Sequence, residues 1–160
     1  MILFFAQGEC DSDAFVTYCY ERYAELVPGL PASTEIVRVP GEKPRLTAEG
    51  VHFSLSHSHG VIMAGFSDAE IGVDIEKVRP VRRERFAFVD AADERDFFAK
   101  WTERESYLKY TGAGLKDFRA PIPQGAHFEH FDVFDGYDAC VCAPRQDIIA
   151  YLLDISEISG

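Results

Sequence analysis

Asp74 and Glu76 are the first residues whose types and spacing suggest chemistry. They lie in the segment 71–76, which we expect to form a strand. Side chains alternate along a strand, so these two carboxylates share one face while Val73 and Ile75 point into the core. Neighbouring carboxylates have raised pKa values unless a cation lies between them. Their oxygen ligands favour Mg²⁺ or Ca²⁺ over Zn²⁺, although an isolated pair is more often a solvated strand face.

A third carboxylate, Glu105, lies in a segment with the periodicity of a helix over residues 91–110, which Gly112 and Gly114 are expected to end. Glu105 and Lys109 are separated by one helical turn and therefore share one helix face. On the surface they would form an ordinary ion pair. If the helix instead faces the strand 71–76, Glu105 joins the metal ligands and Lys109 faces a phosphate, as is typical of magnesium sites.

The polar segment 56–60 is expected to be a turn between two strands. Within it, His57 has a side chain that donates hydrogen bonds to phosphates, and the neighbouring hydroxyls and turn amides would add further donors. Polar turns of this kind are also common without any bound ligand.

The elements that must position these residues alternate between helical and strand-like patterns. We expect a helix that begins at residues 11–13 and ends before the Pro-Gly-Leu-Pro segment 28–31. Apolar segments at 1–6, 51–55, 61–66 and 71–76 predict strands, and residues 127–154 alternate further strand-like segments with turns. The fold class is therefore α+β, with helices packed against antiparallel strands.

Composition limits the function classes. The chain has 160 residues, of which 47% are hydrophobic, and a formal net charge of -11. This charge argues against a general nucleic-acid or anionic-membrane binder. No apolar run approaches the length of a membrane span, and the short apolar start predicts a strand and not a signal peptide. We expect the four cysteines to be reduced thiols in a cytoplasmic protein.

The motifs occur in an order that resembles the 4'-phosphopantetheinyl transferases of the surfactin-synthetase type, in a short variant. The resemblance rests on these segments: Gly41-Glu42-Lys43-Pro44-Arg45-Leu46, Phe53-Ser54-Leu55-Ser56-His57-Ser58, Ile71-Gly72-Val73-Asp74-Ile75-Glu76, Trp101-Thr102-Glu103-Arg104-Glu105-Ser106-Tyr107-Leu108-Lys109 and Gly112-Ala113-Gly114-Leu115. Each motif alone is weakly specific, whereas the ordered set is strong.

The resemblance implies transfer of the phosphopantetheine arm of coenzyme A to a serine of an apo carrier protein, with release of 3',5'-ADP. Mg²⁺, or Mn²⁺ in its place, would be held by Asp74, Glu76 and Glu105 together with the coenzyme A pyrophosphate. Glu105 would also accept the serine proton, and Lys109 would stabilise charge on the pyrophosphate.

The resemblance also implies a coenzyme A site and an architecture. The nucleotide end, with its 3'-phosphate, would be lined by Lys43, Pro44, Ser56 and His57. The chain would fold as a monomer of two similar α+β halves, 1–68 and 69–160, each with a small antiparallel sheet and a packed helix. The active site would lie between these halves of a pseudo-dimer.

Two departures from the family pattern bear on its partners. Longer relatives carry basic residues near the start that hold the 3'-phosphate, whereas no Lys precedes Lys43 here. The segment 77–100 is compact and contains Arg82, Arg83 and Arg85, which we expect to dock the acidic carrier protein.

Two other functions stay open at this point. One is a catalytically degenerate homologue that binds coenzyme A or a carrier without transfer. The other is an unrelated Mg²⁺-dependent phosphohydrolase that uses the same carboxylates. The motifs around Lys43 and His57 argue against the hydrolase, because a simple hydrolase does not need a site for a nucleotide end.

Overall fold

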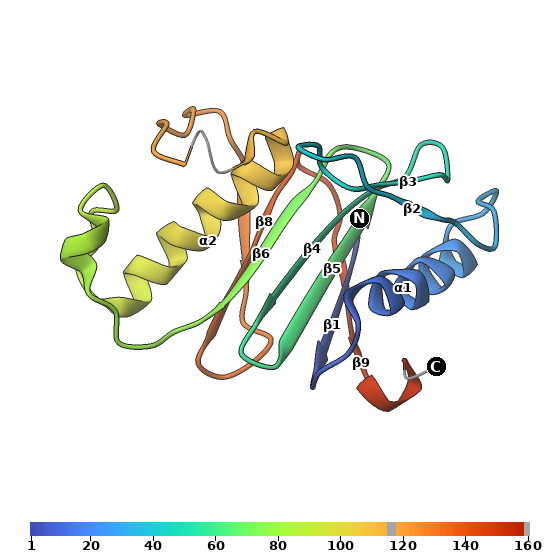
Figure 1. Ribbon diagram of the computed structural model, residues 1–160, viewed down its shortest axis with the longest axis horizontal. Helices are drawn as coiled ribbons and strands as arrows, with labels where there is room; N and C mark the ends of the chain where they lie inside the picture. Colours follow the sequence, from blue (N-terminus) through green and yellow to red (C-terminus); the bar gives the residue numbers. More distant parts are fainter. Residues whose placement is uncertain (115–117, 159–160) are drawn as a thin grey trace.

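The computed structural model describes residues 1–114 and 118–158. Its strands lie in the middle of the molecule, with α1 (Ser12–Leu26) and α2 (Glu94–Thr111) on opposite sides (Figure 1). The predicted α+β class is confirmed. Within the described residues, no helix has both the length and the apolar character needed to span a bilayer.

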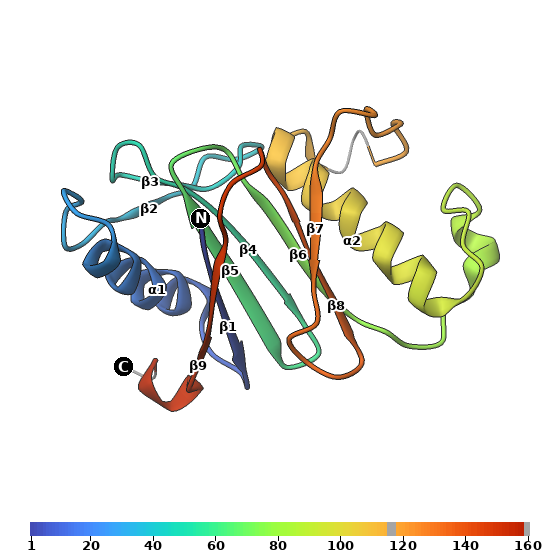
Figure 2. The same ribbon diagram turned by 180° about the vertical axis from the view of Figure 1, so that it is seen from behind.

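The larger sheet has four strands in the order β4-β5-β1-β9. Their bounds are β1 Ile2–Gln7, β4 His52–Ser58, β5 Val61–Ser67 and β9 Ile149–Leu153. The first two pairings in this order are antiparallel, whereas β9 runs parallel to β1, with Phe4 opposite Tyr151. β9 is therefore an edge strand next to β1, and it lies in front of this sheet in the view of Figure 2. The last strand of the chain thus joins the sheet that the first strand begins.

The remaining strands form two smaller sheets. A three-stranded antiparallel sheet has the order β6-β8-β7, with bounds β6 Gly72–Lys77, β7 Phe128–Phe131 and β8 Tyr137–Cys142. A two-stranded sheet pairs β2 Ile36–Val37 with β3 Arg45–Leu46. Short 3₁₀ helices lie at η1 Arg83–Phe86 and η3 Ile155–Glu157.

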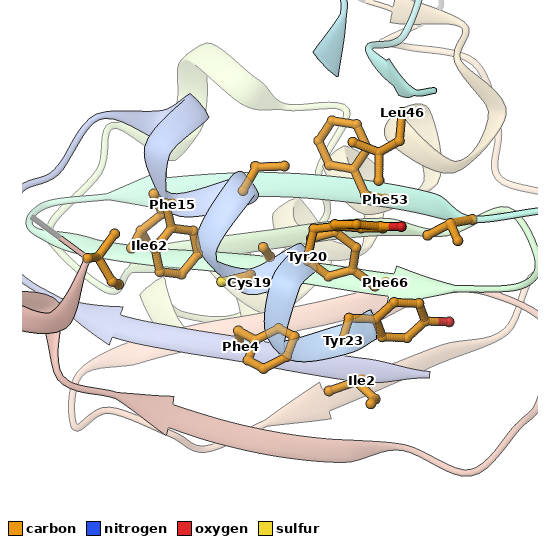
Figure 3. Packing of buried hydrophobic residues seen from close by; sticks show 14 of the residues in the cluster. Ile2, Phe4, Phe15, Cys19, Tyr20, Tyr23, Leu46, Phe53, Ile62 and Phe66 are labelled. Atoms are coloured by element: carbon orange, nitrogen blue, oxygen red, sulfur yellow. The ribbon is translucent and has the colours of Figure 1, made fainter. Parts of the chain in front are cut away.

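Helix α1 begins where the sequence predicts. The Asp11 carboxylate accepts hydrogen bonds from the amides of Asp13 and Ala14, which satisfies donors that a helix start leaves free. One face of α1 packs on the larger sheet and forms a core rich in aromatic rings (Figure 3). Tyr23 and Phe53 both stack on Phe66 at its centre.

Helix α2 begins three residues later than the predicted residue 91. The Asp93 side chain accepts the amide hydrogen bond of Asp96 at 2.8 Å and so sets the first turn. Gly112 ends the helix in a left-handed conformation with φ 70°, as its sequence position predicts. Of the last family motif, Leu115 lies outside the described residues.

The predicted turn at 56–60 is wrong in its extent. Ser56, His57 and Ser58 continue β4 and pair with β5, and the chain reverses at His59 and Gly60, whose φ values are 47° and 76°. Ser56 and Ser58 are buried in this strand, and their hydroxyls donate to Asp74 and Glu76 inside the protein.

The two larger sheets share a second apolar core. Leu3, Phe5 and Met63 of the four-stranded sheet pack against Val73 and Ile75 of β6, as the alternation of that segment predicts. Along the chain, β1, α1, β4 and β5 follow one another, and their strands lie in the spatial order β4-β5-β1. The same arrangement recurs in β6, α2, β7 and β8, whose strands lie in the order β7-β8-β6. The division into halves 1–68 and 69–160 stays a prediction.

Candidate functional site

Asp74 lies near the middle of β6 and is 4% exposed. Its Oδ1 atom accepts hydrogen bonds from the Ser56 hydroxyl at 2.7 Å and from the Lys109 ammonium at 2.8 Å. Within the described part of the chain, its buried Oδ2 atom has no hydrogen-bond partner. An unpartnered buried carboxylate oxygen is costly, so the site is arranged for a further cationic or donor group.

The close approach of α2 to β6 brings the helical residues to Asp74. A Cβ atom added at Gly72 would lie 1.8 Å from the carbonyl oxygen of Ser106 and 2.4 Å from the amide nitrogen of Tyr110. Only glycine therefore lets the helix rest on the strand at this crossing. The meeting of strand and helix, which spacing alone does not establish, is a property of the tertiary structure.

Asp74 and Glu105 both have pKa values above the ordinary values of their side chains. Burial raises the pKa of Asp74, although Lys109 and Ser56 act in the opposite direction. Burial also raises the pKa of Glu105, followed by the negative charge of Asp74 and then that of Glu76, while Lys109 lowers it. The mutual effect of these acids shows that a cation placed among them would stabilise their charged forms.

Three serines of β4 connect it to β6 along the whole site. The hydroxyls of Ser54, Ser56 and Ser58 accept hydrogen bonds from the β6 amides of Val73, Ile75 and Lys77 at 3.0, 3.3 and 3.3 Å. Ser58 also donates to the Glu76 carboxylate at 2.8 Å. The sequence suggested Ser56 for the nucleotide end, whereas its hydrogen bonds are to Asp74 and to the β6 backbone.

A cavity of about 350 Å³ opens beside the carboxylates. It is lined by Lys43, Pro44, Glu105 and Lys109, which the sequence assigned to one site, and also by the glycines Gly41, Gly112 and Gly114. Lys43 is held there because its ammonium donates to the Glu70 carboxylate at 2.9 Å and to the Ile71 carbonyl at 2.6 Å.

Arg38 lies next to the candidate site, although the sequence did not assign it there. A second hollow of about 240 Å³ shares Lys43, Pro44 and Lys109 with the first and adds the exposed Arg38, which is ion-paired with Asp13. The signal available in the sequence was that Arg38 is the last basic residue before Lys43. Three cations from separate segments thus line adjoining hollows.

His57 lies apart from these cavities. Its exposed side chain lines another hollow of about 400 Å³, together with Cys10, Ser12 and His59 at the start of α1 and the β4–β5 turn. The assignment of His57 to the nucleotide end stays a prediction.

The donor set fits a hard divalent cation. Oxygen atoms dominate it, and Asp74 offers an unpartnered atom. Among residues 1–114 and 118–158, however, no three His, Cys, Asp or Glu side chains are already gathered at ligand positions. The assignment of Asp74, Glu76 and Glu105 as metal ligands therefore stays a prediction.

Comparison with known proteins confirms the resemblance to 4'-phosphopantetheinyl transferases. The chain is 31% identical to 4'-phosphopantetheinyl transferase ffp of Bacillus subtilis over 126 residues, which cover 60% of this chain and 56% of that protein. It is 34% identical to psf-1 of Bacillus pumilus over 77 residues, covering 40% and 33% of the two chains.

A third relative is Sfp of Bacillus subtilis (strain 168), 28% identical over 126 residues, with 60% of this chain and 56% of Sfp covered. The chain thus spans about half the length of the curated relatives it matches, or less. No protein-family model matches the chain.

Proposed function

We propose that this chain transfers the 4'-phosphopantetheine arm of coenzyme A to a serine of an apo carrier protein, with release of 3',5'-ADP. The observation that carries this proposal is the buried Asp74, whose Oδ2 atom lacks a partner while its Oδ1 atom is held by Lys109. The cavity lined by Lys43, Glu105 and Lys109 adjoins it, and the named relatives are phosphopantetheinyl transferases.

In this proposal, Asp74, Glu76 and Glu105 hold Mg²⁺ or Mn²⁺. The metal, when bound, neutralises charge on the pyrophosphate and helps to hold it for in-line displacement. Ser56 and Ser58 keep the first two carboxylates in place through their hydroxyl donors. They are positioning residues, because their hydrogen bonds are to the acids and the β6 backbone.

Glu105 is the proposed base. Its raised pKa makes it a better proton acceptor than an exposed glutamate. The carrier serine oxygen forms a bond to the phosphorus that bears the pantetheine arm, and Glu105 takes the serine proton. The bond from that phosphorus to the bridging oxygen breaks, and 3',5'-ADP leaves with the electron pair. Lys109 stabilises the charge that develops on this leaving group.

We place coenzyme A along the two adjoining hollows. Lys43 and Pro44 line both of them, so they would contact the nucleotide end. Arg38 is the added cation for the 3'-phosphate, whereas His57 lines neither of these two hollows. This assignment is supported by the clustering of positive charge near a cavity in an otherwise acidic protein.

The carrier protein is proposed to dock on the segment between β6 and α2. Arg82 and Arg85 are exposed there, whereas Arg83 is half-buried and donates to the Ala91 carbonyl at 2.6 Å. The three predicted docking arginines therefore differ in exposure and in their contacts. Arg82 and Arg85 suit an acidic partner, and Arg83 fixes the shape of its own segment.

The deciding experiment mixes the protein with coenzyme A, Mg²⁺ and a panel of apo carrier proteins. The carriers are then weighed by mass spectrometry, and we expect one phosphopantetheine arm on at least one of them. Omission of Mg²⁺ with added chelator is the control. Binding of coenzyme A without any adduct would support the degenerate homologue instead.

A further inference from the structure

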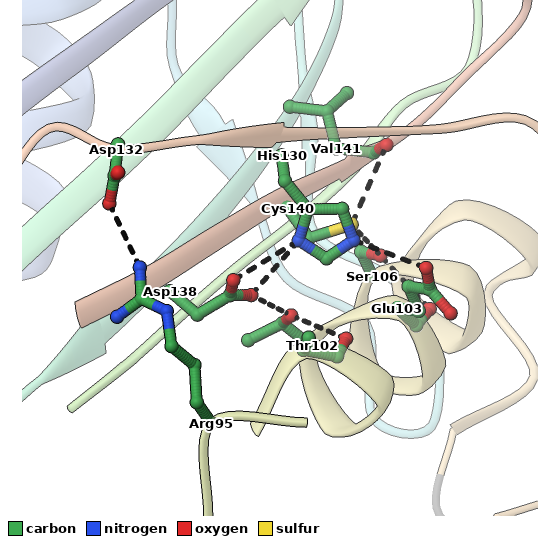
Figure 4. Close-up of polar contacts among 10 residues, drawn as sticks. Arg95, Thr102, Glu103, Ser106, His130, Asp132, Asp138, Cys140 and Val141 are labelled. Atoms are coloured by element: carbon green, nitrogen blue, oxygen red, sulfur yellow. Dashed lines mark hydrogen bonds and ion pairs between the residues drawn. The ribbon is translucent and has the colours of Figure 1, made fainter. Parts of the chain in front are cut away.

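His130 of β7 lies between two carboxylates that belong to different elements (Figure 4). Its Nδ1 atom is 3.1 Å from Oδ2 of Asp138 on β8, and its Nε2 atom is 3.1 Å from Oε1 of Glu103 on α2. We call these three residues the His130 clamp. It joins α2 to the sheet on the side of the helix away from β4.

The clamp requires a charged imidazole. A neutral imidazole has one N–H group and donates to one carboxylate, whereas the imidazolium donates to both. Hydrogen bonding to Asp138, and then to Cys140 and Glu103, raises the pKa of His130 to about 12, against the effect of burial. The side chain is only 34% exposed, so the two ion pairs are partly shielded from water.

Further polar contacts reinforce the same flank of α2. The Thr102 hydroxyl donates to the Asp138 carboxylate, and the Ser106 hydroxyl contacts the Cys140 sulfur at 3.6 Å. Arg95, near the start of the helix, lies 3.3 Å from Asp132. Figure 4 shows these contacts running from the helix to Asp138 and Cys140 of β8 and to Asp132, which directly follows β7.

The opposite flank of α2 carries the proposed active site. Glu103 and Glu105 are two residues apart, which places them about 200° apart around the helix axis. Lys109 reaches Asp74 at 2.8 Å on that second flank, while the helix rests on Gly72 between the two attachments. The two attachments thus lie on either side of the contact with Gly72 and together oppose rotation of α2 about its axis.

We propose that His130 is a positioning residue that prevents α2 from rolling and so holds Glu105 and Lys109 over Asp74. This inference rests on the proposed function, because its consequence is measured at the carboxylate site. Among the hydrogen bonds of the described residues, none joins His130 directly to Asp74, Glu105 or Lys109.

The test compares His130→Gln, His130→Arg and His127→Gln with the wild type. Glutamine is neutral and does not replace the positive charge between the two carboxylates. Arginine is positively charged and has N–H donors for both carboxylates. His127 is the matched control, because its Nε2 atom lies 3.0 Å from Oε1 of Glu129 on the neighbouring strand β7, and no hydrogen bond of the described residues joins it to a carboxylate of α2. Two quantities are measured: amide hydrogen exchange across α2, and Mn²⁺ affinity in the presence of coenzyme A by calorimetry.

We expect His130→Gln to speed exchange in residues 99–107 and to raise the Mn²⁺ dissociation constant by about 10-fold or more. His130→Arg should restore both values, and His127→Gln should leave both near those of the wild type. A loss shared equally by the His127 variant would overturn the inference, because it would reflect general stability.

Failure of the inference and failure of the proposed function give different results. If the wild type transfers phosphopantetheine and His130→Gln binds Mn²⁺ and transfers equally well, the positioning role is wrong and the function stands. If the wild type neither binds Mn²⁺ with coenzyme A nor modifies any carrier, the proposed function is wrong, and the inference fails with it.

Discussion

Asp74 is a buried carboxylate, which is unfavourable for stability, and it is also a proposed metal ligand. Its carboxylate is buried, and its pKa is raised by that burial, so the charged form is disfavoured in the protein without a cation. Such groups are typical of functional sites, although ion-pair networks also produce them.

Asp74→Asn should therefore separate function from stability. The amide keeps an acceptor for Ser56 and Lys109 but removes the buried charge. We expect Mn²⁺ binding to be lost and kcat/KM to fall by about 10³-fold or more. Thermal unfolding without metal should change little, because the neutral form is the one that burial favours. Transfer at a rate near wild type would remove the metal assignment.

Arg38 offers a second prediction at the scale of single residues. If its guanidinium holds the 3'-phosphate, Arg38→Ala should raise KM for coenzyme A by about 10-fold, as for loss of one charge-assisted contact. KM for dephospho-coenzyme A, which lacks this phosphate, should be unchanged. An equal rise for both substrates would place Arg38 elsewhere. Arg22→Ala is the matched control, because Arg22 pairs with Glu25 and lines neither hollow.

At the scale of elements, the site depends on how closely α2 approaches β6. Gly72→Ala places a methyl group against helix backbone, which cannot move aside as a side chain would. We expect a loss of about 1–3 kcal/mol in unfolding free energy, with a larger relative loss of transfer. Gly125→Ala is the control: a Cβ atom there meets nothing within 4 Å, so stability should change by less than about 0.5 kcal/mol.

The His130 clamp predicts a pH dependence on the alkaline side. The pKa of His130 is raised in the folded protein from 6.5 to about 12, so its stabilising effect is complete below 6.5 and is lost as pH rises toward 12. The groups that face it are Glu103 on α2 and Asp138 and Cys140 on β8.

Denaturant unfolding of wild type and His130→Gln should therefore show a free-energy difference that shrinks from about pH 7 to about pH 10. The corresponding difference for His127→Gln serves as the control for general alkaline effects. A difference for His130→Gln that stays constant across this range would show that the imidazole is not held as a cation.

At the scale of the whole molecule, a net charge of -11 opposes the approach of an acidic carrier protein. Local positive charge at Arg82 and Arg85 would offset this repulsion. Changing both to Ala should raise KM for the carrier severalfold with little effect on KM for coenzyme A. The wild-type KM for carrier should also rise with salt over about 0.05–0.3 M, because salt screens exposed charges.

Arg83→Ala is the comparison for that pair. Its guanidinium is bonded to the Ala91 carbonyl, so its loss should lower stability more than it raises KM for the carrier. An unchanged KM for carrier in the Arg82→Ala, Arg85→Ala double variant would show that the carrier docks elsewhere.

The sequence by itself determined the α+β class, the start of α1 within residues 11–13, the end of α2 at Gly112 and the shared face of Asp74 and Glu76. These features follow from local rules, namely side-chain alternation, helix periodicity and capping chemistry. The ordered motifs also identified the family that the chain resembles, which the relatives confirm.

Only the tertiary structure decided how these residues meet. That Ser56 continues a strand and donates to Asp74, that Lys109 reaches Asp74, and that Arg38 adjoins Lys43 all depend on contacts between distant segments. Such contacts arise from packing, here the crossing of α2 over Gly72, and packing leaves no periodic signal in the chain. The same holds for the His130 clamp, whose members come from three separate elements.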